Sequence, residues 1–317
     1  MEKNPQVLIL SANAKVPLIR AFQAAGAVVH GADISRLRAG LVFADQRVIL
    51  PETGAADFAD HLLTYCRDHR IALVLPSRDG DLLPLLRLKP ALQDIGAIGL
   101  VPNAAAIGTC LDKIAFHSYC QSNNFPTARR YRPGMSGPLF IRPAVGAGSG
   151  AAYSVANADD VRFRNDDDWL AQEFVAAPEY SIDLLCDIEG QPMQAVARRR
   201  ILTRAGEAQI SAVEEQPELT ALAMALAENL QLVGHNVVQA FLHPTRGALL
   251  IEVNARFGGA STLSIEAGLN SPARILANLT DPKEGRQNGD IQLGLTLLRY
   301  PSDHFVRPES DFVEPAG

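Results

Sequence analysis

The first hundred residues alternate regularly between short apolar runs and helical patterns, and this order narrows the fold more than any other feature. The segments "QVLILSA", "AVVHGAD" and "IALVLPS" are nearly all apolar, which is typical of strands buried on both faces. Between them, residues 15–25, closed by Gly26, and residues 57–69 show helical patterns. Strand–helix–strand order with buried strands predicts a parallel sheet covered by helices on both sides.

After Pro102 and Asn103 the pattern changes. A further amphipathic helix is expected over residues 111–123, followed mainly by strands joined through Gly, Pro and Asp loops, with one helix at 217–231. This succession predicts a largely antiparallel sheet, so the fold class is α/β followed by α+β. The expected strands are "PLFIRP", "AAYSV", "WLAQEFV", "YSIDLLCDI", "QAVARRRIL", "NVVQAFL" and "ALLIEVNA". The predicted domains are 1–102, 103–172 and 173–300, with an extended tail at 301–317.

Composition excludes several classes of protein. The chain has 317 residues, of which 47% are hydrophobic and 20% charged, as in an ordinary globular protein. A net charge of −6 with only short basic clusters argues against nonspecific nucleic-acid binding. No run of 18 apolar residues and no secretory signal occur, so we expect a cytoplasmic protein that does not associate with a membrane. Four scattered cysteines indicate reduced thiols rather than a zinc site.

The segment "LLIEVNARFGGAS" at 249–261 places three polar side chains two residues apart within an apolar strand. Glu252, Asn254 and Arg256 therefore share one face, while Ile251, Val253 and Ala255 face a core. If this strand pairs with "NVVQAFL" around a turn centred between Thr245 and Arg246, Gln239 lies opposite Glu252.

Three oxygen donors at Gln239, Glu252 and Asn254 would suit a hard cation such as Mg²⁺, with Mn²⁺ as a substitute. Arg256, one step further along the same face, could hold phosphate oxygens that the metal leaves free. A solvent-facing amphipathic strand would show the same pattern, and the sequence alone leaves both interpretations open.

Two further segments indicate a nucleotide. In "PLFIRPAVGAGSG", Arg142 precedes a glycine-rich loop whose backbone amides could approach phosphates, although a plain glycine-rich hairpin would look alike. The spacing matches neither the dinucleotide fingerprint nor a Walker A loop. The strand "WLAQEFV" ends where its backbone could meet an adenine edge, and Glu173 and Glu179 could reach an amine and a ribose hydroxyl.

A third group of candidate residues consists of basic side chains on one strand and two loop segments. In "AVARRRIL", Arg198 and Arg200 share one strand face and Arg199 lies on the other. Either this is a basic surface strand, or, in the ligase reaction that the family resemblance stated next implies, Arg198 or Arg200 contacts an acyl-phosphate or a substrate carboxylate. The segments "SANAKVP" and "PSRDGD" follow strands at the carboxyl edge of the predicted parallel sheet and could border an acceptor pocket.

Taken together, these segments resemble the ATP-grasp superfamily, in particular its carbamoyl-phosphate-synthase-like carboxylate–amine ligases. The resemblance implies an N-terminal pre-ATP-grasp domain followed by a two-lobed ATP-grasp fold with one such unit, where carbamoyl-phosphate synthase has two. It implies that Lys113 binds ATP phosphates, since "DK" at Asp112 opens a helix. The other implied ATP-binding residues are Arg142, Gly146, Gly148, Ser149, Glu173, Phe174, Val175 and Glu179. The implied metal ligands are Gln239, Glu252 and Asn254, and the implied phosphate-binding catalytic arginine is Arg256. Arg198 and Arg200 are further catalytic candidates, which come from the strand pattern.

The resemblance also implies a reaction. A small carboxylate would be phosphorylated by ATP and joined to an amine, with amino acids as the expected substrate type and a homodimer as the expected assembly. No nucleophile–base pair stands out in the sequence, and none is needed, because a carboxylate is already ionised at neutral pH. A phosphotransferase that releases a stable phospho-product and a nucleotide sensor without turnover remain as alternatives.

Overall fold

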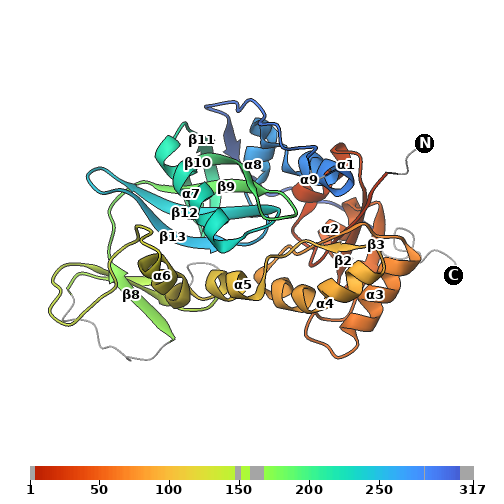
Figure 1. Cartoon of the computed structure of the whole chain (residues 1–317), viewed down its shortest axis with the longest axis horizontal. Coiled ribbons are helices and arrows are strands. Elements are labelled where there is room, and N and C mark those ends of the chain that lie inside the picture. The colour runs from red at the N-terminus through yellow and green to blue at the C-terminus, as the bar shows by residue number, and fades with distance from the viewer. Residues whose placement is uncertain (1–3, 147–150, 158–167, 282, 308–317) are drawn as a thin grey trace.

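The computed structural model describes residues 4–146, 151–157, 168–281 and 283–307. Figure 1 shows an elongated molecule in which helices α4 (Leu82–Asp94), α5 (Ala104–Leu111) and α6 (Lys113–Ser122) follow one another along one edge. They lead from an N-terminal sheet to a small three-stranded sheet. The large sheet lies above this row of helices in the view of Figure 1.

The N-terminal sheet is parallel throughout, which confirms the prediction from apolar strand runs. Its strand order is β3-β2-β1-β4-β5. The strands are β1 (Gln6–Ile9), β2 (Val28–Asp33), β3 (Gln46–Ile49), β4 (Leu73–Leu75) and β5 (Ile98–Gly99). The predicted helices appear as α1 (Val16–Ala24) and α3 (Phe58–Asp68), and α2 (Ala39–Phe43) lies between β2 and β3.

Several elements here are not predicted from the sequence. Strand β3 exposes three of its four residues and therefore lacks the apolar pattern of a buried strand. Helix α4 contains two prolines, which usually indicate a break. Pro84 lies in its first turn, where no intrahelical donor is lost, and the helix also tolerates Pro90. A short 3₁₀ helix, η1 (Asp79–Asp81), precedes α4.

The strands in the rest of the chain are antiparallel, as predicted, but they form two sheets where the sequence predicted one. The small sheet has the order β7-β6-β8 and the large sheet the order β13-β12-β9-β10-β11-β14. The strands of the small sheet are β6 (Leu139–Pro143), β7 (Tyr153–Val155) and β8 (Trp169–Glu173). Those of the large sheet are β9 (Glu179–Cys186), β10 (Pro192–Arg204), β11 (Glu207–Val213), β12 (His235–His243), β13 (Gly247–Asn254) and β14 (Thr296–Leu298).

The predicted helix at 217–231 is α7 (Pro217–Leu230), which packs on β9 and β10. After β13 come α8 (Thr262–Ser264), a π-helical turn η3 (Ile265–Leu269) and α9 (Ser271–Thr280). One buried core joins the N-terminal sheet to the large sheet, since Leu8 and Val74 belong to the same cluster as Ile182 and Val253. The boundaries proposed after residues 102, 172 and 300 stay predictions.

Among the described residues, no helix is long and apolar enough to cross a membrane.

Candidate active site

A cleft of about 670 Å³ lies where the N-terminal domain meets the large sheet. Its walls come from the loop after β4, the junction of α5 and α6, strands β10 to β13 and the glycine-rich segment after β13. Many residues predicted for the site lie on its surface. They are Lys113, Gly146, Arg198, Arg200, Gln239, Glu252, Asn254 and Arg256.

Strands β12 and β13 bring the predicted oxygen donors together. Gln239 pairs directly with Glu252, which confirms the expected register. The predicted turn centre is off by half a residue, because His243 pairs with Gly247 around Thr245. A bulge on β13, where Ile251 is the extra residue opposite the step from Gln239 to Ala240, shifts the register so that Gln239 faces Glu252.

The same bulge corrects another expectation. Val253 and Ala255 lie in the buried core as predicted, whereas Ile251 is only partly buried and belongs to neither large core cluster. An extra residue in a strand reverses the alternation of its faces. Its effect is that Leu250 and Val253, three residues apart, both enter the core.

The donor set suits a hard cation. Gln239, Glu252 and Asn254 offer carboxylate and amide oxygens on one wall of the cleft, and Mg²⁺ prefers such ligands while keeping some positions for phosphates and water. Among the described residues, no group of three or more His, Cys, Asp and Glu side chains could hold a metal ion. A metal site with three protein ligands in this cleft would therefore need amide oxygens beside the Glu252 carboxylate.

Arg142 does not line the cleft but contacts β13, which forms this wall. Its guanidinium is 8% exposed, donates from Nη1 to Glu252 Oε2 at 3.2 Å and from Nη2 to the Ile251 carbonyl at 2.9 Å. Burial lowers the pKa of Arg142 below its ordinary value, and Glu252 opposes this shift. The structure thus places Arg142 against the proposed metal ligand rather than on the open surface of the cleft.

Arg198 and Arg200 are not part of a basic surface strand. Arg198 is 2% exposed, and Arg200 is also largely buried, while Arg199 is half exposed and pairs with Glu214. Arg200 Nε lies 2.9 Å from Glu179 Oε1, and its Nη2 donates to the Gly206 carbonyl at 2.8 Å. Burial raises the pKa of Glu179, against the attraction of Arg200. Glu179, predicted to reach a ribose, is thus an ion-pair partner of an arginine in the cleft.

Asp183 on β9 is a functional candidate that the sequence analysis missed. This fully buried carboxylate forms an ion pair with Arg198, lies 3.0 Å from His235 Nε2 and accepts hydrogen bonds from the hydroxyls of Ser261 and Ser264. Burial alone would raise its pKa, but Arg198 and His235 hold the pKa of Asp183 well below its usual range. The available signal was an acid within the apolar run "YSIDLLCDI".

The Asp183 contacts fix two parts of the cleft. Ser261 Oγ also accepts from the Gly258 backbone N–H at 2.8 Å, which anchors the glycine-rich segment after β13. Arg198 Nη1 is buried without a hydrogen-bond partner among the described residues, and Arg198 lines the cleft. A buried guanidinium with one unused nitrogen is suited to bind an anion.

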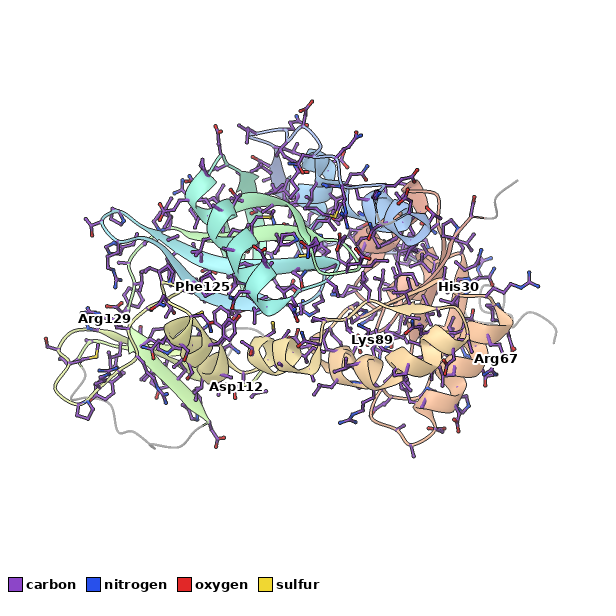
Figure 2. The ribbon with its side chains drawn as sticks, viewed as in Figure 1. His30, Arg67, Lys89, Asp112, Phe125 and Arg129 are labelled. Atoms are coloured by element: carbon purple, nitrogen blue, oxygen red, sulfur yellow. The ribbon has the colours of Figure 1, made fainter. Side chains whose placement is uncertain are left out.

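Lys113 begins α6 as the sequence motif predicts. Asp112 caps this helix, with Oδ1 accepting from the Ile114 and Ala115 amides, and lies between α5 and α6 in Figure 2. The Lys113 backbone N–H donates to the Ala144 carbonyl, and its Nζ donates to the Gly146 carbonyl at 2.7 Å. Lys113 is therefore held next to the first glycine of the predicted flap. Gly148 and Ser149 lie outside the described residues.

The predicted adenine-binding segment lies off the cleft surface. Both carboxylate oxygens of Glu173 already accept hydrogen bonds, from Arg129 at 2.7 Å and from Arg246 at 2.5 Å. Although partial burial alone would raise it, these bonds hold the pKa of Glu173 below its ordinary value. The Phe174 amide donates to the Pro138 carbonyl, and Val175 packs in a small apolar cluster.

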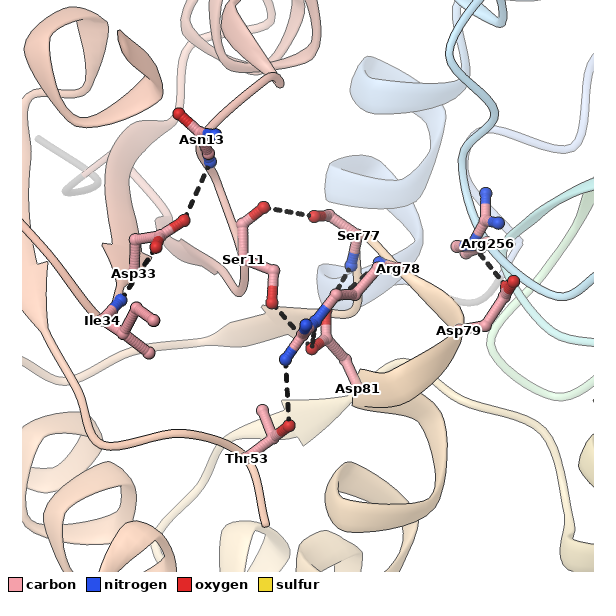
Figure 3. Close-up of polar contacts among 10 residues, drawn as sticks. All are labelled: Ser11, Asn13, Asp33, Ile34, Thr53, Ser77, Arg78, Asp79, Asp81 and Arg256. Atoms are coloured by element: carbon pink, nitrogen blue, oxygen red, sulfur yellow. Dashed lines mark hydrogen bonds and ion pairs between the residues drawn. The ribbon is translucent and has the colours of Figure 1, made fainter. Parts of the chain in front are cut away.

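Arg256 connects the site to the N-terminal domain. Its Nε donates to Asp79 Oδ1 at 2.6 Å, as Figure 3 shows, and its Nη2 donates to Asn254 Oδ1 at 3.3 Å. Asp79 belongs to the "PSRDGD" segment, which the sequence analysis expected near an acceptor pocket. Arg78, Asp79 and Gly80 all line the cleft.

Positive charge dominates the cleft although the protein as a whole is acidic. Six basic side chains line it against three acidic ones, an excess of three positive charges in a chain of net charge −6. The basic residues are Arg78, Lys113, Arg198, Arg200, Arg256 and Arg299, and the acidic ones are Asp79, Glu207 and Glu252. This excess of basic side chains is suited to bind a polyanion such as a nucleoside triphosphate together with a cation.

Comparison with protein families agrees with this geometry. A family model described as ATP-grasp in the biosynthetic pathway with Ter operon matches residues 165–298, and one described as PylC-like, N-terminal domain, matches residues 7–100. Residues 165–298 belong to the ATP-grasp superfamily. The expected order of an N-terminal α/β domain and an ATP-grasp fold is thereby confirmed. No curated protein matches the sequence of this ATP-grasp chain.

Solved ATP-grasp structures share its fold. The L-amino acid ligase from Bacillus licheniformis is 17% identical with a TM-score of 0.69, over 92% of this chain and 78% of that one. The biotin carboxylase domain of 2-oxoglutarate carboxylase from Hydrogenobacter thermophilus, solved with MgADP and bicarbonate, is 14% identical with a TM-score of 0.67, over 87% and 70%. Rhizobium etli pyruvate carboxylase is 16% identical with a TM-score of 0.71, and the match covers 92% of this ATP-grasp chain but 30% of that enzyme.

Proposed function

We propose that this ATP-grasp chain is a Mg²⁺-dependent ligase that activates a small carboxylate with ATP and joins it to an amine. The observation that carries the proposal is the cleft itself. There, three oxygen donors on β12 and β13 meet an excess of basic side chains in one cavity of about 670 Å³. This combination is suited to a magnesium–triphosphate and an anionic substrate side by side.

In the proposed reaction, a carboxylate oxygen attacks the γ-phosphorus of ATP, and the bond between the γ-phosphorus and the oxygen bridging to ADP breaks. The acyl-phosphate that results is attacked at its carbonyl carbon by an amine nitrogen. Phosphate then leaves with the C–O bonding pair, and the nitrogen loses a proton to solvent. Gln239, Glu252 and Asn254 would hold Mg²⁺, and the bound ion would neutralise charge on the phosphates.

The basic residues would have distinct tasks. Lys113 would bind ATP phosphates next to Gly146, and Arg256 would bind phosphate oxygens from the opposite wall. Arg198, with its unused Nη1, is the proposed contact for the acyl-phosphate or the substrate carboxylate. Because ion pairs hold Arg198 and Arg256 and a hydrogen bond to the Gly146 carbonyl holds Lys113, the site would need little rearrangement when the transition state forms.

Amino acids are the proposed substrate type. Support comes from the fold shared with an L-amino acid ligase, which at 17% identity supports the fold and leaves the substrates to experiment. The proposal also keeps the cytoplasm as the location, as expected from the sequence, and a homodimer as the assembly, from the resemblance to this superfamily.

The test is an ADP-release screen over pairs of amino acids and small carboxylic acids, with mass spectrometry of the products. We expect ADP, phosphate and a condensed product only when both acceptors are present. Glu252→Gln should lower the rate at least about 100-fold, whereas Glu228→Gln, an exposed glutamate on α7, should not change it. A stable phosphorylated product from one acceptor would indicate a phosphotransferase, and ATP binding without turnover a sensor; either result overturns the proposal.

A further inference from the structure

A second cavity, here called the N-terminal pocket, lies in the N-terminal domain and has a volume of about 380 Å³. It lies outside the carboxyl ends of β1, β2, β3 and β4, whose following residues form its walls. The chain winds from β1 toward β3 in one direction and then toward β5 in the other. Open parallel sheets bind ligands outside the strand ends, at such a reversal.

The pocket has an apolar floor and a polar rim. The floor consists of the buried side chains of Leu10, Ala32, Leu50 and Phe58. The rim carries two acids and two arginines together with small polar groups. Its members are Ser11, Asn13, Asp33, Arg38, Glu52, Thr53 and Arg78.

The rim is organised without any ligand. Asp33 accepts from the Asn13 amide at 3.1 Å and from the Ile34 amide at 2.9 Å, and Arg38 lies 3.3 Å from its Oδ1. Gly40 allows this arrangement, because a Cβ there would lie 1.7 Å from the Ala12 carbonyl oxygen. Helix α2, which follows Arg38, can therefore pack tightly on the loop that carries Asn13.

Arg78 is held by a fully buried carboxylate. Asp81 accepts from Arg78 Nε at 3.0 Å, from the Ser77 amide at 3.1 Å and from Ser11 Oγ at 2.8 Å, while Arg78 Nη2 donates to Thr53 Oγ1 at 3.2 Å. Figure 3 shows Arg78 turned toward Ser11 and Thr53, whereas its neighbour Asp79 turns toward Arg256. Arg78 lines both cavities, and Asp79 lines only the cleft.

Backbone strain occurs at the same place. Ser11 has a φ of 50°, which is uncommon for a residue other than glycine. Its hydroxyl and its carbonyl are both used, by Asp81 and Ser77. Residues held in such conformations cluster at binding sites, where the surrounding contacts maintain the strain.

The charges on the rim define the ligand. Asp33 and Arg38 neutralise each other, and Asp81 neutralises Arg78 in part, leaving Arg78 Nη1 outside the hydrogen bonds found among the described residues. No described side-chain contact engages the carboxylate of Glu52, an exposed residue next to Thr53 in the sequence. An acid and an arginine nitrogen without partners among the described side chains thus line the same pocket as the apolar floor.

We propose that the N-terminal pocket binds a free amino acid with an aliphatic side chain, separately from the cleft. Its ammonium group would pair with Glu52, its carboxylate with Arg78, and its side chain would pack on Leu10, Leu50 and Phe58. The two charged groups of an α-amino acid are attached to one carbon, and the pocket of about 380 Å³ is lined by an acid and an arginine that could each pair with one of them. A nucleotide does not suit this pocket, because the turn from Ser11 to Lys15 has no glycine to admit a phosphate.

The test is binding to the whole chain without nucleotide, measured by calorimetry and saturation-transfer NMR with L-valine, L-leucine, L-isoleucine and L-methionine as probes. We expect at least one of them to bind, and 4-methylpentanoate and 3-methylbutylamine, which each lack one charged group of leucine, to bind at least about 10-fold more weakly than leucine. Glu52→Gln should weaken binding by a similar factor, while Glu228→Gln and the cleft variant Glu252→Gln should preserve it.

These outcomes separate the pocket from the reaction. Absence of binding by all four amino acids overturns the proposal, as does binding that Glu252→Gln removes and Glu52→Gln leaves unchanged. The proposal would also be overturned if 4-methylpentanoate and 3-methylbutylamine, which each lack one charged group, bound as tightly as leucine. Because no ATP is present, failure of the proposed ligase activity would not affect the result.

Discussion

At the scale of single residues, the basic groups of the cleft differ in how far they are neutralised before a ligand binds. Arg198, Arg200 and Arg256 each have an acidic partner within the protein, namely Asp183, Glu179 and Asp79. Lys113 Nζ instead donates to a carbonyl, and within the described part of the chain it forms no ion pair. Its charge is therefore the most available of the four for the phosphates of ATP.

This leads to a prediction on pH. Burial and the nearby Arg142 lower the pKa of Lys113, against the attraction of Glu252. A lysine with a lowered pKa contributes its charge below that pKa and loses it as pH rises through it, so KM for ATP should increase at a lower pH than an ordinary lysine would allow. In Lys113→Arg the guanidinium stays charged, and we expect the increase between about pH 7 and about pH 10 to disappear.

Lys89 provides the matched control for this measurement. Burial also lowers its pKa, but Lys89 lies on α4 (Figure 2), its Nζ donates to the Val101 carbonyl, and it does not line the cleft. Lys89→Arg should therefore keep the alkaline increase in KM of the unchanged protein. If Lys113→Arg retained that increase too, another group would be responsible and the assignment of Lys113 would be wrong.

At the scale of elements, strand patterns predicted much of what positions the site. The spacing of Glu252, Asn254 and Arg256 gave their shared face, and the length of the hairpin gave the pairing of Gln239 with Glu252. The bulge beside Gln239 could not be predicted, because either strand could absorb one extra residue without changing its apolar pattern. Asp183 was missed for a related reason: its partners Arg198, His235 and Ser261 lie on other elements, and sequence spacing does not reveal such contacts.

Strand β2 carries a buried histidine that should make the stability of the N-terminal domain depend on pH. His30 is 2% exposed, with Nδ1 2.8 Å from the Tyr65 hydroxyl and Nε2 2.8 Å from Gln6 Oε1. Burial, together with the neighbouring His69, lowers the pKa of His30 from 6.5 to about 4. The folded state then binds fewer protons than the unfolded state between these values, so the free energy of unfolding decreases as pH falls through this window.

The expected loss is about 1–3 kcal/mol between neutral pH and about pH 4. Chemical denaturation at a series of pH values should show this slope in the unchanged protein and a clearly smaller slope in His30→Gln. His61→Gln, at an exposed position on α3, should keep the original slope. Identical slopes for all three proteins would mean that His30 titrates normally in the folded state.

At the scale of the whole molecule, the N-terminal domain completes the cleft rather than standing apart from it. Arg78, Asp79 and Gly80 supply part of its wall, and one buried core runs from the N-terminal sheet into the large sheet. The pKa of Lys15 is lowered by burial and by the charge of the nearby Arg256. The contact between domains is therefore built from a shared apolar core and from charged residues that also belong to the site.

The ion pair between Asp79 and Arg256 should link these two domains energetically. Both side chains are partly buried, 29% and 13% exposed, and the atoms Oδ1 and Nε are 2.6 Å apart. In a double-mutant cycle of Asp79→Asn and Arg256→Gln, we expect a coupling of about 1–2 kcal/mol in the free energy of unfolding. The pair of Glu207 and Arg299 is the control, because its glutamate is 67% exposed and water screens the attraction; its coupling should stay below about 0.5 kcal/mol. Additive effects of the two substitutions at Asp79 and Arg256 would show that the domains are joined by the apolar core alone, and that the loop after β4 lies at the cleft without stabilising it.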